Sequence, residues 1–255
     1  MSFLVVIPAR AASSRLPDKP LLDIGGLPMV VRTANQARLS RATRVVVATD
    51  DERIVQAVQA HGHEVLMTRA DHPTGTDRLA QVVQMLALPD DALVVNVQGD
   101  EPLIDPAMID AVAELLGETP EASIATCAAP VRDADTLFNP NAVKVVCDLR
   151  GRALYFSRAP MPWARDALAG GERVLAPGLP ALHHIGLYAY RASFLREFVR
   201  LQTGELERYE SLEQLRALEN GYAIAVAKMP ALPHGGVDTE ADLARVRGMF
   251  SGKVV

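Results

Sequence analysis

Cysteine is scarce in this sequence. Of 255 residues only Cys127 and Cys147 are cysteines, each lies within an apolar run, and there is no Cys-X-X-Cys motif. Without closely spaced thiols the chain cannot build a zinc ribbon or a thioredoxin-like site. Buried free thiols are typical of a reducing compartment, so we expect two unpaired cysteines and a cytoplasmic protein.

Long apolar runs and an excess of positive charge are also missing. No segment approaches the roughly 18 consecutive apolar residues of a membrane-spanning helix. The apolar start, residues 1–8, is short and lacks the basic flank of a signal peptide. The formal net charge of -5 is unfavourable for general nucleic-acid binding. We therefore expect neither a membrane nor a nucleic acid among the partners.

Three common nucleotide and hydrolase motifs are absent. The sequence has no Gly-X4-Gly-Lys-Ser/Thr loop, no Gly-X-Gly-X-X-Gly after the first apolar run, and no Gly-X-Ser-X-Gly. Any nucleotide would therefore not be held as in a P-loop ATPase or a dehydrogenase, and an α/β-hydrolase is disfavoured. The composition, with 49% hydrophobic and 22% charged residues, is that of a folded globular protein.

Apolar, β-branched runs alternate with helical patterns along the first half of the chain. We expect strands at residues 3–7, 45–49, 64–68 and 93–97, and helices at 28–39, 54–60, 76–88 and 109–116. This order predicts parallel strands joined by right-handed crossovers. Strands that are apolar throughout predict a sheet covered on both faces.

The pattern changes after about residue 123. We expect strands at 124–130, 142–147, 153–157, 184–190 and 223–228, helices at 194–199, 207–220 and 239–250, and a loop at 166–180. No linker separates the two halves. The sequence therefore predicts one α/β domain over residues 1–255, with a smaller elaboration at approximately 124–200.

A loop with three cations follows the first predicted strand. Residues 8–21 contain Arg10, Arg15 and Lys19, with small residues between them. Ligands of an open parallel sheet bind beyond the carboxyl ends of its strands, and Arg can hold phosphate oxygens through paired hydrogen bonds. The loop is therefore a candidate phosphate site. The alternative is three solvated charges on a surface loop.

Asp100 follows the predicted strand that ends at Val97, and Gly99 before it leaves room for a ligand. Carboxylate oxygens suit Mg²⁺, which often needs only one or two of them when substrate phosphates supply the rest. The alternative role, a helix cap, is better filled by Asp105, which directly precedes Pro106. Asp100 is therefore a candidate metal ligand.

Two further segments precede predicted helices. Residues 68–78 combine Arg69, small hydroxyl side chains and Gly75, which favours a polar or anionic ligand. Residues 235–243 contain Asp238 and Thr239, either of which suits an N-cap. On local grounds, capping is the favoured explanation of Asp238.

Together these segments resemble the motifs of the sugar-acid cytidylyltransferases. The first signature is residues 7–10 with 14–21, and the second is residues 96–102 at a strand end. Residues 68–72, 138–144, 155–158, 212–216 and 236–239 narrow the resemblance to members that use 3-deoxy-manno-octulosonate (KDO). The resemblance covers essentially the whole chain. It departs from the family at Ala11, where an aromatic residue is common, and at Asp18, where Gly is frequent.

The resemblance implies a Rossmann-like nucleotidyltransferase fold with a mainly parallel sheet. The implied reaction transfers CMP from CTP to the anomeric hydroxyl of KDO and releases pyrophosphate. Mg²⁺ is the implied cofactor, with Asp100 and Asp238 as its ligands, so metal binding replaces capping as the favoured role of Asp238. The resemblance also implies a homodimer formed through the second-half elaboration and a product used in lipopolysaccharide synthesis.

The family pattern also assigns site residues. The catalytic set is Arg10, Arg15, Lys19 and Asp100, in which the cations neutralise the phosphates. The nucleotide set is Pro8, Ala9, Arg10, Ser14, Arg15, Lys19, Arg69, Thr74, Gly75 and Gln98, and the sugar set is Gln98, Arg158, His184, Tyr188, Glu210 and Gln214. Two alternatives stay open: another sugar-acid acceptor, such as 8-amino-KDO or sialic acid, and a nucleotide-binding module without catalysis.

Overall fold

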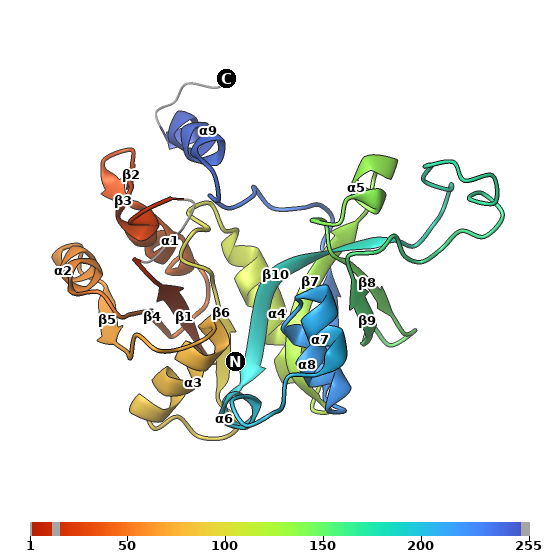
Figure 1. Ribbon diagram of the computed structural model, residues 1–255. Helices are drawn as coiled ribbons and strands as arrows, with labels where there is room; N and C mark the ends of the chain where they lie inside the picture. Colours follow the sequence, from red (N-terminus) through yellow and green to blue (C-terminus); the bar gives the residue numbers. More distant parts are fainter. Residues whose placement is uncertain (1, 12–15, 251–255) are drawn as a thin grey trace.

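A mixed β-sheet forms the centre of the molecule, and helices cover both of its faces (Figure 1). The computed structural model describes residues 2–11 and 16–250. The main path of the sheet runs in the order β11-β7-β10-β6-β1-β4-β5. Its strands are β1 (Phe3–Ala9), β4 (Arg44–Thr49), β5 (Glu64–Met67), β6 (Leu93–Asn96), β7 (Ala122–Pro130), β10 (Leu182–Arg191) and β11 (Ala223–Lys228).

Strand β10 is the antiparallel member of this path. It runs against both β6 and β7, whereas β1 is parallel to β4 and β6, β4 is parallel to β5, and β11 is parallel to β7. This arrangement confirms the predicted mainly parallel sheet. Because β1, β4 and β6 point the same way, their carboxyl ends meet at one edge, where ligands of such sheets bind.

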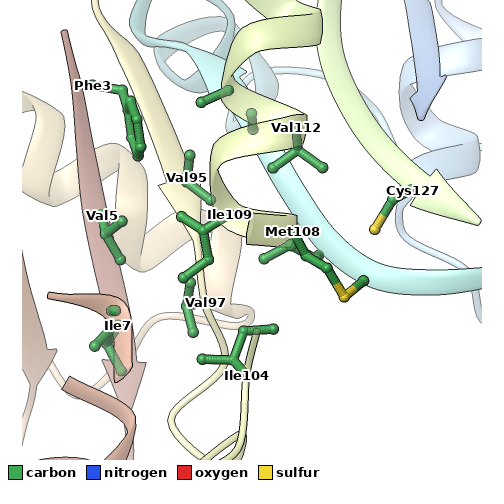
Figure 2. Close-up of a cluster of buried hydrophobic side chains, with 14 of the residues drawn as sticks. Phe3, Val5, Ile7, Val95, Val97, Ile104, Met108, Ile109, Val112 and Cys127 are labelled. Carbon is green, nitrogen blue, oxygen red and sulfur yellow. The ribbon is translucent and has the colours of Figure 1, made fainter. Parts of the chain in front are cut away.

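Helices α1 (Met29–Ala37), α2 (Glu52–Ala60) and α4 (Pro106–Glu118) cover one face of the sheet. Phe3, Val5 and Ile7 alternate along β1 and all point to this side (Figure 2). Val95 and Val97, in and just after β6, lie beside them, and Met108, Ile109 and Val112 of α4 pack on top. Full burial of such a side chain contributes roughly 1.5–3 kcal/mol, so this layer holds the strands and α4 together.

Helices α3 (Gly75–Met85), α6 (Ala192–Phe198) and α8 (Gln214–Glu219) cover the opposite face. Leu4, Val6 and Val94 point to this side, where they belong to one apolar cluster with Leu79 of α3 and Leu215 of α8. Both faces of the central strands are therefore buried, as their continuously apolar sequence predicts.

Three local features differ from the sequence-based expectation. The predicted helix at 207–220 is two helices, α7 (Glu205–Glu210) and α8. Ser211 between them has a φ of 51°, in the left-handed region, and a right-handed helix cannot continue through a residue in that conformation. The short helix α5 (Ala134–Phe138) and the hairpin of β2 (Asp23–Ile24) and β3 (Leu27–Pro28) were not expected. All three are short elements, for which periodicity carries little information.

The second half of the chain adds a hairpin to the sheet. Strands β8 (Lys144–Cys147) and β9 (Ala153–Ser157) pair with each other, and β8 pairs with the start of β10. In Figure 1 this hairpin and the long loop between β9 and β10 (green to teal) project from the body of the molecule. They fall within the predicted elaboration at 124–200, whose dimerisation role stays a prediction.

The last helix, α9 (Glu240–Phe250), packs back on the N-terminal half. A separate apolar cluster joins Leu243 and Val246 of α9 to Val237 before it and to Ile24 and Met29 of the first 30 residues. This cluster fixes the segment that carries Asp238. Across the described ranges 2–11 and 16–250, we find no helix with the length and apolar character needed to cross a bilayer.

Candidate active site

Lys19 lies between the two predicted metal ligands. Its Nζ is 2.6 Å from Asp100 Oδ2 and 3.2 Å from Asp238 Oδ1, and it donates a further hydrogen bond to the backbone oxygen of Val237 at 3.0 Å. Burial alone lowers the pKa of Lys19, but its contacts with Asp100 and then with Asp238 raise the pKa above the ordinary value. Two carboxylates that are far apart in the sequence therefore meet on one cation.

The backbone around Asp100 brings Asp238 to this position. Asp100 follows the carboxyl end of β6, and the backbone N–H of Val237 donates to the backbone oxygen of Asp100 at 2.9 Å. The side chain of Val237 is fully buried in the apolar cluster that anchors α9. Val237 thus fixes the backbone directly before Asp238, both by this hydrogen bond and by its apolar packing.

Thr239 and Asp242 cap α9. Thr239 Oγ1 accepts a hydrogen bond from Asp242 N at 3.2 Å, and Asp242 Oδ2 accepts from Thr239 N at 3.0 Å. This reciprocal pair is a capping box. The capping that local sequence attributed to Asp238 or Thr239 is therefore performed by Thr239. At α4, the predicted cap is confirmed, because Asp105 Oδ1 accepts from Ala107 N at 2.9 Å.

Two glycines allow the segments of this site to approach one another. A Cβ at position 99 would lie 2.9 Å from the backbone oxygen of Pro8 in β1. A Cβ at position 236 would lie 2.8 Å from Glu101 Oε1 and 3.1 Å from the backbone oxygen of Asp100. Gly99 and Gly236 therefore let the end of β1 and the segment before Asp238 close on Asp100.

Glu101 is a third carboxylate near this pair, and sequence reasoning left it without a role. Burial, followed by the charges of Asp100 and Asp238, raises the pKa of Glu101 to about 7. Its Oε2 is buried with no hydrogen-bond partner within residues 2–11 and 16–250. Its position directly after a predicted metal ligand is the signal that could have singled it out.

The residues present fit a magnesium ion. Asp100 and Asp238 offer hard carboxylate oxygens that already converge on a single cationic atom, the Nζ of Lys19. In the part of the chain that the structure describes, no group of three or more His, Cys, Asp or Glu is placed to hold a metal. One or two protein carboxylates are the usual requirement when phosphates and waters complete the shell. The ligand role of Asp100 and Asp238 stays a prediction.

The predicted phosphate loop lies partly within the described residues. Pro8 and Ala9 end β1, and Arg10 follows it. Arg10 Nη2 is buried and has no hydrogen-bond partner in the described part of the chain, so it retains donor capacity for a ligand. Ser14 and Arg15 lie outside the described residues.

Asp18 shows how this chain accommodates its departure from the family pattern. Its φ is +52°, in the left-handed region where glycine is favoured. Its carboxylate accepts hydrogen bonds from Arg53, with Nη1–Oδ2 at 3.1 Å and Nη2–Oδ1 at 2.8 Å. Arg53 therefore offsets the negative charge that Asp18 adds near the cationic loop.

Arg69 and Thr74 are placed differently from each other. The Arg69 side chain is 68% exposed, pairs with Asp71 at 3.2 Å and lines an open groove between α3 and α6. Thr74 is the N-cap of α3, where its Oγ1 accepts from Asp77 N at 3.2 Å. The presence of Thr at position 74 is thus explained by folding. The nucleotide-binding roles of Arg69 and Thr74 stay predictions.

One cavity of about 100 Å³ joins predicted nucleotide residues to predicted sugar residues. Gly75 and Gln98 from the first set line it together with Tyr188 and Gln214 from the second. The remaining lining residues are Thr76, Asn96, Ile124, Tyr190, Phe198 and Glu213. Sequence reasoning missed Asn96 and Glu213, although each lies next to or near an assigned residue in the same motif. The cavity is therefore lined by members of both predicted residue sets, whose binding roles stay predictions.

Arg158 and Glu210, from the predicted sugar set, do not line this cavity. Arg158 Nε donates to the backbone oxygen of Glu210 at 2.7 Å, and Nη1 donates to that of Pro140 at 3.0 Å. Glu210 Oε2 accepts from Arg158 N at 2.9 Å. Although burial opposes it, hydrogen bonding from Arg158 N, Ser157 and Tyr155 lowers the pKa of Glu210. These contacts tie β9 to α7.

His184 is also outside the cavity lining. Its Nε2 lies 2.9 Å from Thr126 Oγ1, and its ring meets the edge of Phe156. Burial, with a smaller contribution from His183, lowers the pKa of His184 to about 3, so the ring is neutral at ordinary pH. A neutral core imidazole gives no support to the prediction that His184 holds the sugar.

The fold is that of a nucleotidyltransferase, and a comparison with protein-family models identifies the family. The model of the cytidylyltransferase family matches residues 4–226. The chain belongs to the cytidylyltransferase family.

Solved structures give a more particular likeness. The chain is similar to a CMP:2-keto-3-deoxy-manno-octonic acid synthetase whose structure is complexed with CTP, with 40% identity over 99% of each chain and a TM-score of 0.88. It also resembles a cytidylyltransferase from Leptospira borgpetersenii serovar Hardjo-bovis (strain JB197), with 17% identity over 100% of this chain and 88% of the other and a TM-score of 0.60. The second likeness shows the fold, and together they confirm the predicted nucleotidyltransferase fold.

Proposed function

We propose that this chain transfers CMP from CTP to the anomeric hydroxyl of KDO, which is 2-keto-3-deoxy-manno-octonic acid. The observation that carries the proposal is the convergence of Asp100 and Asp238 on Lys19 at the carboxyl end of β6, in a member of the cytidylyltransferase family. The likeness to a KDO-activating synthetase over 99% of both chains supports the choice of acceptor.

In the proposed reaction the anomeric oxygen forms a bond to the α-phosphorus of CTP and loses its proton. The bond from the α-phosphorus to the bridging oxygen breaks, and pyrophosphate leaves. Little covalent chemistry is asked of the protein, so its contribution is positioning and charge neutralisation. Arg10, Arg15 and Lys19 would neutralise the phosphates. Gln98 would lie between the nucleotide and the sugar, because it lines the cavity that both predicted sets share.

Asp100 and Asp238 would hold the metal ion. When bound, Mg²⁺ would supply charge stabilisation to the phosphates or activate the attacking hydroxyl. The raised pKa of Lys19 keeps its side chain cationic between the two carboxylates in the absence of the metal. Their shared contact with Lys19 supports the assignment of both aspartates to one cation site.

We also propose a homodimer in the cytoplasm whose product feeds lipopolysaccharide synthesis. Exposed Leu149 and Leu154 in the β8–β9 hairpin support a self-association surface within the elaboration at 124–200. The free state of Cys127 and Cys147 supports a reducing compartment. Light scattering on the purified protein tests the dimer, and a monomer at micromolar concentration would contradict it.

The direct test is pyrophosphate release by the purified protein with CTP and Mg²⁺. KDO, 8-amino-KDO and sialic acid are offered as separate acceptors, and Asp100→Asn serves as the matched control. We expect the highest kcat/KM with KDO and almost no release by the control. Preference for another acid would favour that acceptor, whereas absence of turnover with all three would leave a nucleotide-binding module.

A further inference from the structure

Two buried amide side chains line the same cavity, and each has one polar atom without a hydrogen-bond partner among the residues that the structure describes. Asn96 is 3% exposed and Gln214 is 8% exposed, and both line the cavity of about 100 Å³ between the sheet and helices α3 and α8. Asn96 Oδ1 and Gln214 Nε2 are both buried and unpartnered within the described residues. One atom is an acceptor and the other is a donor, so the cavity wall offers complementary polar groups.

An asparagine at position 96 is unfavourable for the stability of the fold. It ends a strand whose preceding residues, Leu93 to Val95, are apolar, and asparagine is depleted in strands. Its backbone pairs with Val6 on one side and Tyr188 on the other, so the side chain lies well inside the sheet. Buried polar groups in native proteins are almost always paired. A valine would serve the strand better, which suggests that the amide serves a ligand.

The surroundings of the two amides select the chemistry of that ligand. A hydroxyl group can donate to Asn96 Oδ1 and accept from Gln214 Nε2, whereas a carboxylate has no proton to donate and an ammonium has no lone pair to accept. Glu213 also lines the cavity, where its Oε1 accepts from Thr74 Oγ1 at 3.0 Å, and a ligand carboxylate would be repelled by it. The volume corresponds to roughly three waters, which suits a small hydroxyl-bearing part of a larger molecule.

We propose that Asn96 is a specificity-determining residue that recognises a hydroxyl of the sugar-acid substrate, whose carboxylate lies outside this cavity. This inference rests on the proposed function and deepens it. Tyr188 and Tyr190, whose rings stack on each other at 5.8 Å between centroids, also line the cavity and add aromatic carbon to its wall. Unpartnered amide groups and aromatic carbon in one cavity together match the hydroxyls and the carbon skeleton of a sugar.

The test is Asn96→Val, a β-branched replacement that suits the end of β6. We expect the KM for KDO to rise about tenfold or more, the effect of one lost hydrogen bond of about 1.4 kcal/mol, while the KM for CTP changes less than about twofold. The melting temperature is expected to stay equal or rise, because an unpartnered buried polar group is removed. A merely structural residue would show the opposite pattern, with lower stability and no selective effect on KDO.

KDO analogues that each lack a single hydroxyl identify the contact. The wild-type protein is expected to use one analogue about tenfold less efficiently than KDO, and Asn96→Val is expected to lose that discrimination. Thr126→Val is the matched control, because Thr126 is equally buried but its Oγ1 is bonded to Leu187 O at 2.8 Å and to Ile185 O at 3.2 Å. It is expected to lower the melting temperature and leave discrimination unchanged.

The possible outcomes distinguish a failure of the role of Asn96 from a failure of the proposed CMP transfer to KDO. If the wild-type protein turns over KDO and Asn96→Val keeps the same KM and the same discrimination, the role of Asn96 is refuted and the proposed function stands. If the wild-type protein turns over no sugar acid, both are refuted. If Asn96→Val does not fold, Asn96→Thr retains a hydroxyl in the strand and is expected to give an intermediate KM, and a wild-type KM for it would overturn the inference.

Discussion

Replacing Asp238 with asparagine distinguishes a role of its negative charge in metal binding from a role of the side chain in the stability of the fold. The Asp238 side chain is 55% exposed, and its Oδ1 lies 3.2 Å from Lys19 Nζ. An exposed ion pair of this kind contributes about 0–1 kcal/mol to stability. A protein of this size changes its melting temperature by about 2–4 °C per kcal/mol. We therefore expect Asp238→Asn to melt within about 4 °C of the wild-type protein.

The effect on metal binding is expected to be larger. Two unit charges 4 Å apart interact by about 1 kcal/mol in water and about 4 kcal/mol near a protein surface. Because Mg²⁺ carries two charges, these limits double to about 2 and 8 kcal/mol. The partial exposure of Asp238 favours the lower limit, and a loss of about 2–3 kcal/mol should raise the Mg²⁺ concentration for half-maximal activity about 30- to 150-fold. Pyrophosphate release measured against Mg²⁺ concentration, with a thermal melt on the same samples, gives both quantities.

Thr239→Ala is the matched control because it removes the cap of α9 and leaves both carboxylates in place. Loss of an N-cap costs about 0.5–2 kcal/mol of stability. This variant should melt at a lower temperature, while its Mg²⁺ dependence stays that of the wild-type protein. Full activity of Asp238→Asn at an unchanged Mg²⁺ requirement would refute the two-aspartate site and leave Asp100 as the remaining protein carboxylate for the metal.

Three further outcomes are expected. Asp100→Asn should fold normally and lose more than about 90% of its pyrophosphate release; a smaller loss, under about 1.4 kcal/mol of transition-state stabilisation, would remove Asp100 from the metal site. Gly99→Ala should lower the free energy of unfolding by about 1–3 kcal/mol, because the new Cβ would lie 2.9 Å from Pro8 O; an unchanged urea midpoint would contradict this. The folded-state pKa of His184, about 3, is below its unfolded value near 6.5, so the unfolded chain binds the proton first and stability falls as the pH drops through this window. His184→Gln should reduce that fall by about 1–2 kcal/mol between pH 7 and pH 5, and equal slopes in urea titrations would exclude the assigned cause.

The part of the site that sequence could predict lies where a motif follows a strand. Lys19 and Asp100 were predicted from loops after apolar strands, and the structure places them 2.6 Å apart. Asp238 needed the family resemblance, because its local sequence favours a helix cap. Only the long-range packing of α9 brings it to Asp100, and no local pattern encodes such packing.

The parts that sequence could not predict depend on neighbours across the sheet. An asparagine after three apolar strand residues carries no signal for the cavity that Asn96 lines, since Tyr188 and Gln214 come from β10 and α8. The antiparallel insertion of β10 between β6 and β7 is likewise invisible to periodicity, which gives strands but not their order. The family resemblance assigns His184 to the sugar set, and no periodicity could predict that its Nε2 lies 2.9 Å from Thr126 Oγ1 of the neighbouring strand; its sugar-binding role stays a prediction.

The anchoring of Asp238 by the segment before α9 has a consequence for biosynthesis. Chains grow at about 5–20 residues per second, and Asp238 follows Asp100 by about 140 positions, so it is added roughly 7 to 28 s later. The central sheet also waits for β10, which lies between two strands made before it. During translation, nascent chains therefore acquire the cationic loop and Asp100 well before the second carboxylate, whereas the last strand of the sheet, β11, ends at Lys228, shortly before Asp238. A polypeptide interrupted between β11 and Asp238 would retain every strand of the sheet yet lack half of the proposed metal site, so this site is the last part of the enzyme to be completed.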